Sequence, residues 1–259
     1  MNPCPISVFI IAQDEADRIP ITIASVIEWA DEVIVIDSGS SDDTVEVSEK
    51  LGANVVFNAW KGYGPQKVYG EKLCKHDWVL NLDADEEVTE ALRDEIIALF
   101  TNGEPPLQVY RIPRLPIYGF QQHGHPWTAF LKTVRMYKKS VCGFKDEIVH
   151  DSVLVPKDVK IGTLKSMINH RSFRSLQHHV EKTNGYSTMQ AEVLLDKGRK
   201  TNFLAMLILP FFAFWKSYLL RREFVNGIDG ILTSHMYAFM RFIRYAKLRE
   251  LEHKKRNEK

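Results

Sequence analysis

The chain has 259 residues, of which 45% are hydrophobic and 26% charged, so it is long enough and apolar enough for one folded α/β domain with an appendage. Its formal net charge of +1 gives no indication of a nucleic-acid partner. Three widely separated cysteines, Cys4, Cys74 and Cys142, favour neither a disulfide framework nor a zinc site and fit a reducing cytoplasm.

The first hundred residues alternate between predicted strands and predicted helices. Short apolar runs predict strands at 6–12, 33–36, 54–58 and 78–82. Helices are predicted at 21–29, 44–51 and 89–100, and a further helix follows the glycine-containing loop at 60–67 and ends at 73. Gly52 stands where a helix C-terminal glycine is expected. No basic segment of a signal peptide precedes the first strand. This alternation predicts a mostly parallel sheet with helices on both faces.

Acidic residues follow three of the predicted strands. Asp14 and Glu15 follow the first strand, Asp37 ends the second, and Asp83 and Asp85 follow the run 78–82. Parallel strands end at one edge of the sheet, where ligands bind, and residues at i and i+2 of extended chain point to the same side. Asp83 and Asp85 could therefore face one divalent cation, or they could begin the next helix as a solvated turn. The repetition of acids at one edge favours a site.

The predicted secondary structure changes twice in the second half of the chain. Strands are predicted near 109–112, 132–137 and 161–168, around a segment rich in proline and aromatic residues. Helices are then predicted at 175–195, 203–215 and 228–251. The run 203–215 holds thirteen apolar residues, and from Phe203 onward eleven Lys and Arg stand against five Asp and Glu. No uninterrupted apolar run reaches the roughly 20 residues of a membrane span.

A short apolar helix flanked by cations favours a position in the membrane interface. The alternative is a helical hairpin that packs on the preceding domain or on another subunit.

Four short motifs and the tail carry a resemblance to a known family. The motifs are IAQDE (11–15), VIVIDSGSSD (33–42), NLDADE (81–86) and VHD (149–151), and the tail is rich in arginine and aromatic residues. Over nearly its whole length the chain resembles the family-2 glycosyltransferases of GT-A fold. More narrowly, it resembles the bacterial lipopolysaccharide inner-core β-1,4-glucosyltransferases.

The resemblance implies a Rossmann-like GT-A catalytic domain over 1–170 and a helical, membrane-associating extension over 171–259. The nucleotide-sugar half would be 1–105 and the acceptor half 106–170. The implied reaction is inverting transfer of a sugar, expected to be glucose, from a UDP-sugar to a hydroxyl of a lipid-linked saccharide, the lipopolysaccharide inner core. The implied location is the inner face of the bacterial cytoplasmic membrane, with peripheral contact through the C-terminal helices.

The resemblance also implies site residues. Those expected to bind the nucleotide sugar are Gln13, Asp14, Glu15, Asp37, Lys67, Asp83 and Ala84. Within this set Asp37 would accept a hydrogen bond from uracil, and Asp83 would bind the ribose or the metal. Asp85 would hold Mg²⁺ or Mn²⁺ against the diphosphate. Lys67 could instead be a surface lysine.

Inversion in one step needs a general base beside the acceptor hydroxyl. By position in the family motif this base is Asp151, where family members usually have glutamate. Asp146 and Glu147 are its rivals. His170, after the last predicted strand, is expected either to bind the metal or a phosphate or to be a structural histidine.

Other functions remain alternatives. Within the same fold, the acceptor could be a lipid phosphate or another polysaccharide, or the chain could be a non-catalytic membrane-surface scaffold. A nucleotidylyltransferase would need a glycine-rich basic loop after the first strand, and a nicotinamide dehydrogenase would need G-x-G-x-x-G there. The chain has Gln13-Asp14-Glu15-Ala16 at that place, which disfavours both.

Overall fold

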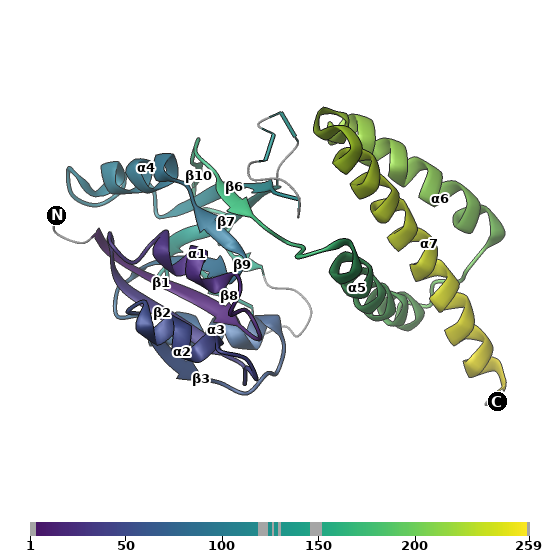
Figure 1. Ribbon diagram of the computed structural model, residues 1–259, viewed down its shortest axis with the longest axis horizontal. Coiled ribbons are helices and arrows are strands. Elements are labelled where there is room, and N and C mark those ends of the chain that lie inside the picture. The colour runs from purple at the N-terminus through teal and green to yellow at the C-terminus, as the bar shows by residue number, and fades with distance from the viewer. Residues whose placement is uncertain (1–3, 119–123, 126, 129–130, 146–151, 258–259) are drawn as a thin grey trace. The chain divides into compact units, whose positions relative to one another are not determined.

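The computed structural model describes residues 4–118, 124–125, 127–128, 131–145 and 152–257. The chain divides into two compact units (Figure 1). A sheet unit comprises Met1–Pro116 and Leu131–His170, and a helical unit comprises Ile117–Phe130 and Arg171–Lys259.

The sheet unit is built on one mixed sheet. Its strands lie in the order β3-β2-β1-β4-β7-β6-β11-β5, and β10 also pairs with β6. The pairs among β3, β2, β1 and β4 are parallel, whereas β7 runs antiparallel to both of its neighbours and β5 runs antiparallel to β11. The bounds are β1 (Cys4–Ala12), β2 (Ala30–Asp37), β3 (Asn54–Phe57), β4 (Trp78–Asp83), β5 (Glu86–Val88), β6 (Val109–Pro116), β7 (Leu131–Lys138), β10 (Ile161–Thr163) and β11 (Ile168–His170). A separate hairpin-like pair joins β8 (Gly143–Phe144) to β9 (Val153–Leu154).

The sheet is covered on both faces. Alternate residues of β1 enter two different cores, because successive side chains of a strand point to opposite faces. One core packs against α1 (Ile19–Ala24), α2 (Thr44–Lys50) and α4 (Glu90–Phe100), and the other packs against α3 (Tyr63–Leu73). The predicted α/β class, with a mostly parallel sheet between helices and a helical C-terminal extension, is confirmed.

Some boundaries differ from the sequence-based expectations. The first helix ends at Ala24 rather than 29, because turns lead from there into β2. The predicted strand at 161–168 is two strands, β10 and β11, which pair with different parts of β6. Strand β5 was not predicted, since only three residues form it. Gly52 follows α2 with a φ of +90°, as expected for a glycine that ends a helix.

The helical unit consists mainly of three helices, α5 (Leu176–Asp196), α6 (Phe203–Trp215) and α7 (Gly227–Asn257). Both α5 and α6 pack along α7. A π-helical turn (Lys216–Leu220) and a 3₁₀ turn (Glu223–Asn226) connect α6 to α7. The helical stretch Phe203–Leu220 is long and apolar enough, by composition, to cross a membrane. The sequence-based estimate stopped at Trp215 because Lys216 interrupts the apolar run, whereas the helical backbone continues past it.

Candidate functional site

The structure brings the predicted acidic residues together at one sheet edge. Strands β2, β1 and β4 are parallel neighbours, with Ala12 paired to Asp37 and Ile11 paired to Asp83. The strand ends that precede Asp14 and Asp85 therefore lie side by side. This is the edge at which open α/β sheets bind ligands.

Asp83 is neutralised by basic side chains from three other elements. Its carboxylate lies 2.9 Å from Lys67 Nζ, 2.7 Å from Arg135 Nη2 and 3.8 Å from Arg114 Nη1. Burial opposes its ionisation, but the charges of Arg135 and Lys67 outweigh burial and hold the pKa of Asp83 well below its usual value. A carboxylate whose negative charge is already balanced by nearby cations can accept a hydrogen bond from a hydroxyl group, but it attracts a metal ion less strongly. Which of its two expected roles Asp83 has, with the ribose or with the metal, stays a prediction.

Lys67 belongs to this network and is not a surface lysine. Its side chain is only 1% exposed, and its ammonium also lies 5.3 Å from the centroid of the Phe144 ring. Helix α3 positions it, because the glycine at position 70 lets the helix approach β1 and β2 closely. The sequence offered one signal for this burial, the small Gly70 on the same face one turn later.

Sequence reasoning missed two arginines and a glutamate. Arg135 on β7 donates to Asn81 Oδ1 and to Glu86 Oε1, each at 2.7 Å, and Arg114 on β6 donates to the same Glu86 oxygen at 3.1 Å. Glu86 is fully buried. The available signal for Arg135 was its position between the apolar residues Val134 and Met136 of a predicted strand, since a buried cation needs an acidic partner.

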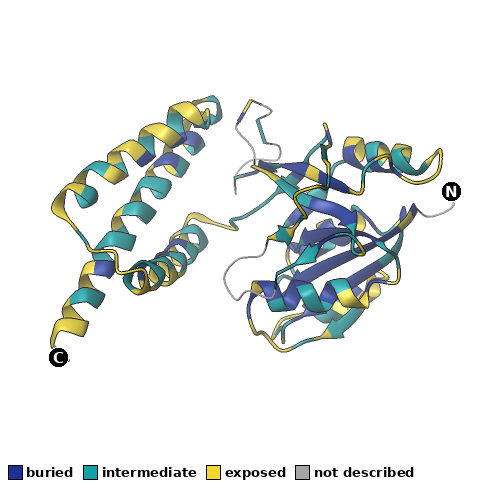
Figure 2. Cartoon of the chain, turned by 180° about the vertical axis from the view of Figure 1, so that it is seen from behind, coloured by how far each residue is buried: buried dark blue, intermediate teal, exposed yellow. Residues whose placement is uncertain are grey.

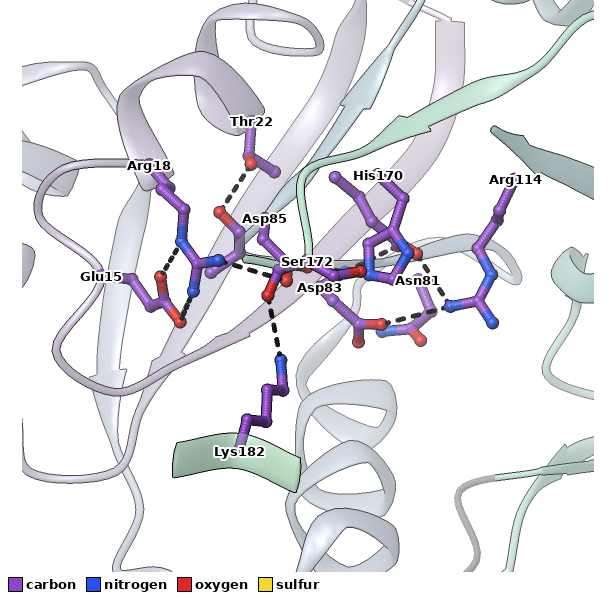
Figure 3. Close-up of polar contacts among 12 residues, drawn as sticks. Glu15, Arg18, Thr22, Asn81, Asp83, Asp85, Arg114, His170, Ser172 and Lys182 are labelled. Carbon is purple, nitrogen blue, oxygen red and sulfur yellow. Dashed lines mark hydrogen bonds and ion pairs between the residues drawn. The ribbon is translucent and has the colours of Figure 1, made fainter. Parts of the chain in front are cut away.

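Asp85 has different surroundings from Asp83. Its Oδ1 lies 3.5 Å from Nε2 of His170, and its Oδ2 lies 3.5 Å from Nη1 of Arg18 (Figure 3). Burial opposes its ionisation, but the hydrogen bond and charge of His170 and the charge of Arg18 lower its pKa on balance. His170 reaches this place because β11 pairs with β5, which begins directly after Asp85.

The residues around Asp85 fit a divalent cation shared with a substrate. Among the residues that the structure describes, no group of three or more His, Cys, Asp or Glu could hold a metal alone. Mg²⁺, however, is commonly bound by one or two protein carboxylates together with water and substrate phosphates. The Asp85 carboxylate is of this kind, and the His170 imidazole, 3.5 Å away, is a possible nitrogen donor beside it. Manganese accepts the same donors.

The remaining predicted residues shape the loops at the strand ends. Asp37 is buried and accepts hydrogen bonds from Gly39 N at 2.8 Å and from Ser40 Oγ at 2.5 Å. Asp14, with a φ of +54°, accepts from Ser41 N at 2.7 Å. The bonds of Asp37 shape the loop after β2, and the bond between Asp14 and Ser41 ties that loop to the loop after β1.

Three further predicted residues lie beside this loop pair. Glu15 holds Arg18 through two bonds of 2.6 and 2.7 Å. Gln13 is exposed at the end of β1. Ala84 is buried, and its carbonyl accepts a hydrogen bond from Thr22 Oγ1 at 2.9 Å. Any contact of Ala84 with a ligand would therefore involve its backbone N–H.

The expected general base lies in a segment without a described structure. Asp151 and its rivals, Asp146 and Glu147, fall in the gap at 146–151, outside the described residues. Their assignment therefore rests on the sequence. The flanking strands, β8 and β9, are described and pair with each other.

Comparisons with known proteins give a family. Residues 7–146 match the family model described as glycosyl transferase family 2. The chain is 41% identical over 260 residues to an uncharacterized glycosyltransferase of Rickettsia conorii, covering 97% of this chain and 92% of the relative. It is 26% identical over 248 residues to the lipopolysaccharide core biosynthesis glycosyltransferase LpsC of Rhizobium meliloti, covering 91% and 90%.

Two solved structures are also similar. S. aureus TarS 1–349 in complex with UDP-GlcNAc matches with a TM-score of 0.48 and 14% identity, over 96% of this chain and 92% of that one. Glucosyl-3-phosphoglycerate synthase from Mycobacterium tuberculosis, crystallised with Mn²⁺, UDP and glucosyl-3-phosphoglycerate, matches with a TM-score of 0.36 and 26% identity. That match covers 44% of this chain and 43% of the synthase.

Proposed function

The chain belongs to glycosyl transferase family 2 and is a glycosyltransferase, and we propose that it moves glucose, with inversion, from UDP-glucose to a hydroxyl of the lipopolysaccharide inner core. The observation that carries the proposal is the contrast between Asp83 and Asp85. Asp83 forms close ion pairs with Arg135 at 2.7 Å and Lys67 at 2.9 Å, whereas the contacts of Asp85 with Arg18 and His170 are longer, 3.5 Å each, and leave its carboxylate better placed to take a cation.

The charge balance supports a role for a divalent cation. Among the described residues at this edge, four basic side chains face four acidic ones, and these are Lys67, Arg18, Arg114 and Arg135 with Glu15, Asp83, Asp85 and Glu86. Asp14 and Asp37 add two further carboxylates at the same edge. Together these side chains carry a net negative charge, which by itself does not attract a diphosphate. A cation held by Asp85 and His170 would provide the missing positive charge. When bound, it would neutralise the charge that develops on the departing nucleoside diphosphate.

The protein residues have separate tasks in this proposal. Asp83, oriented by Arg135 and Lys67, accepts a hydrogen bond from a ribose hydroxyl. Asp37, which already accepts hydrogen bonds from Gly39 and Ser40, accepts a further one from the uracil edge. Asp151 takes the proton of the acceptor hydroxyl as that oxygen attacks the anomeric carbon from the face opposite the leaving group.

The acceptor is proposed from the relatives. LpsC of Rhizobium meliloti, whose name places it in lipopolysaccharide core biosynthesis, is similar over 91% of this chain. A lipid-linked acceptor and a UDP-sugar meet at the inner face of the cytoplasmic membrane, and we place the enzyme there. The sugar is proposed as glucose from the family resemblance alone.

The experiment measures donor binding and UDP release with the full-length protein. The donors are UDP-glucose, UDP-galactose and UDP-N-acetylglucosamine, each with Mn²⁺, Mg²⁺ or EDTA and with a truncated lipopolysaccharide acceptor. We expect metal-dependent binding and turnover of UDP-glucose. No metal-dependent binding of any donor would refute the proposal, and preference for another donor would correct the sugar.

A substitution series tests the base. Asp151→Asn should keep donor binding and lower turnover by about 10²–10⁴-fold, which is the usual contribution of general base catalysis. Asp146→Asn and Glu147→Gln are the matched controls in the same segment and should retain most activity. Loss of turnover in one of these controls, with Asp151→Asn active, would transfer the role to that residue.

A further inference from the structure

One face of α6 exposes a line of large apolar side chains. Leu204, Leu207 and Phe211 follow each other at three- and four-residue intervals, which place them on one side of a helix, and they are 62%, 63% and 61% exposed. Trp215 continues the line one turn later. Figure 2 shows exposed residues along the length of α6. We call this surface the α6 face.

Helix α7 covers only the opposite side of α6. The buried residues there are small, namely Ala213 and, in the following turn, Ser217. The α6 face extends around the tip of the helix pair, where Leu220 and Ile228 are 75% and 77% exposed. Single exposed apolar side chains are ordinary, but a continuous apolar surface of this kind marks an interaction site.

Basic residues stand at both ends of the α6 face. Residues 197–222 contain six Lys or Arg and no Asp or Glu. Lys197, Arg199 and Lys200 precede α6, and Lys216 and Arg222 follow it, and all five are exposed. An apolar strip between cations matches the boundary between the acyl chains and the anionic head groups of a lipid bilayer.

The same charges disfavour a second copy of this chain as the partner. If two α6 faces packed antiparallel about a two-fold axis, the basic residues before one helix would meet the basic residues after the other. If the two helices packed in parallel, like ends would meet. In both arrangements cations face cations, which is costly at an interface.

The helix lies along the membrane rather than across it. Phe203–Leu220 has 18 residues, about 27 Å at 1.5 Å per residue, which is close to the hydrocarbon thickness of a bilayer. Helix α7, however, packs beside α6, with His235 of α7 against Phe214 of α6. A spanning α6 would carry Arg241 of α7, which lies several turns from the tip of the helix pair, into the hydrocarbon, where a charged side chain is costly.

We propose that the α6 face inserts in the plane of the cytoplasmic membrane, with its apolar side chains among the acyl chains and its flanking cations at anionic head groups. This deepens the proposed function, because a lipid-linked acceptor would be met at that surface. The proposed function is needed only to name the cytoplasmic membrane, and the insertion of the α6 face into a lipid bilayer does not depend on it. Lipid binding is measured without sugar transfer, so the two proposals fail separately.

The experiment is flotation of the full-length protein with vesicles of phosphatidylcholine, with and without phosphatidylglycerol. The wild type should float with both, and more strongly with phosphatidylglycerol. Leu207→Glu/Phe211→Glu should lose at least about tenfold in lipid affinity, because two large apolar side chains no longer enter the bilayer. Ile21→Glu/Leu51→Glu, which adds the same two charges at exposed apolar positions of the sheet unit, is the control and should float like wild type.

A second variant tests the charges. Arg199→Glu/Lys200→Glu should lose the preference for phosphatidylglycerol while retaining binding through the apolar strip. Far-UV circular dichroism and thermal melts, measured on every variant, report that the helices remain folded. Flotation of the Leu207→Glu/Phe211→Glu protein equal to wild type, or no flotation of wild type, would overturn the proposal. So would light scattering that shows the same variant converting a dimer to a monomer with flotation unchanged.

Discussion

Replacing Arg135 by leucine would expose how much stability depends on the buried charge network behind the site. The guanidinium makes three charge-assisted hydrogen bonds of 2.7 Å, to Asn81, Asp83 and Glu86. After Arg135→Leu, Glu86 would keep Arg114 at 3.1 Å and the N–H of Asp83 at 3.0 Å. After the change, the buried carboxylates of Asp83 and Glu86 therefore keep some of their positively charged and hydrogen-bonding partners but lose the strongest one.

The expected loss of stability follows from these contacts. Removal of one partner of a buried ion pair typically costs about 3–5 kcal/mol. Because Arg114 and Lys67 remain near the two carboxylates, we expect about 3 kcal/mol, the lower end of that range. Arg135→Lys keeps the charge but not the planar fork, and should cost about 1–2 kcal/mol.

Hydrogen exchange of peptides from β1 and β4 is the suitable assay, since it reports the sheet unit separately from the helical unit. The control is Arg93→Leu, which removes the solvent-exposed pair of Arg93 with Asp94 and should leave stability almost unchanged. Equal exchange in the Arg135→Leu and Arg93→Leu proteins would refute the reasoning.

The pH dependence of stability gives a second test of the ion pair between Arg135 and Asp83. Because the pKa of Asp83 is lowered in the folded protein, its stabilising interaction is present above the unfolded pKa and is lost as the pH falls through the folded pKa. The difference between wild type and Arg135→Leu should stay constant from about pH 8 to 5 and narrow below about pH 4. A difference that grows toward acid pH would contradict this assignment.

Two other substitutions have definite expected outcomes. His170→Gln should weaken Mn²⁺ binding to the UDP complex by about tenfold or more, measured by calorimetric titration, and unchanged affinity would remove His170 from the metal site. Gly70→Ala should lower stability by about 1–3 kcal/mol, because its new Cβ would lie 2.6 Å from Ile36 Cδ1 and 3.0 Å from Phe9 Cδ2, both in the packed core. Gly185→Ala, on a helix with nothing within 4 Å of the new Cβ, is the control and should stabilise by up to about 1 kcal/mol in thermal melts.

The sequence by itself determined the α/β class and the edge at which the site lies. Apolar runs that alternate with helical patterns produce parallel strands, and parallel strands end at one edge. Asp14, Asp37 and Asp83 could therefore be placed near each other without coordinates. The local pattern was sufficient because strand direction follows from the order of the elements.

The tertiary structure alone decided the surroundings of each acid. Asp83 and Asp85 are equivalent in the sequence pattern, but Arg135, 52 residues after Asp83, neutralises the first, and His170, from a distant strand, reaches the second. Likewise, the sequence contained an apolar α6, but only its packing on α7 decided which side stays exposed. Local patterns record which side chains a segment carries, whereas charge compensation and exposure depend on partners that folding brings from elsewhere in the chain.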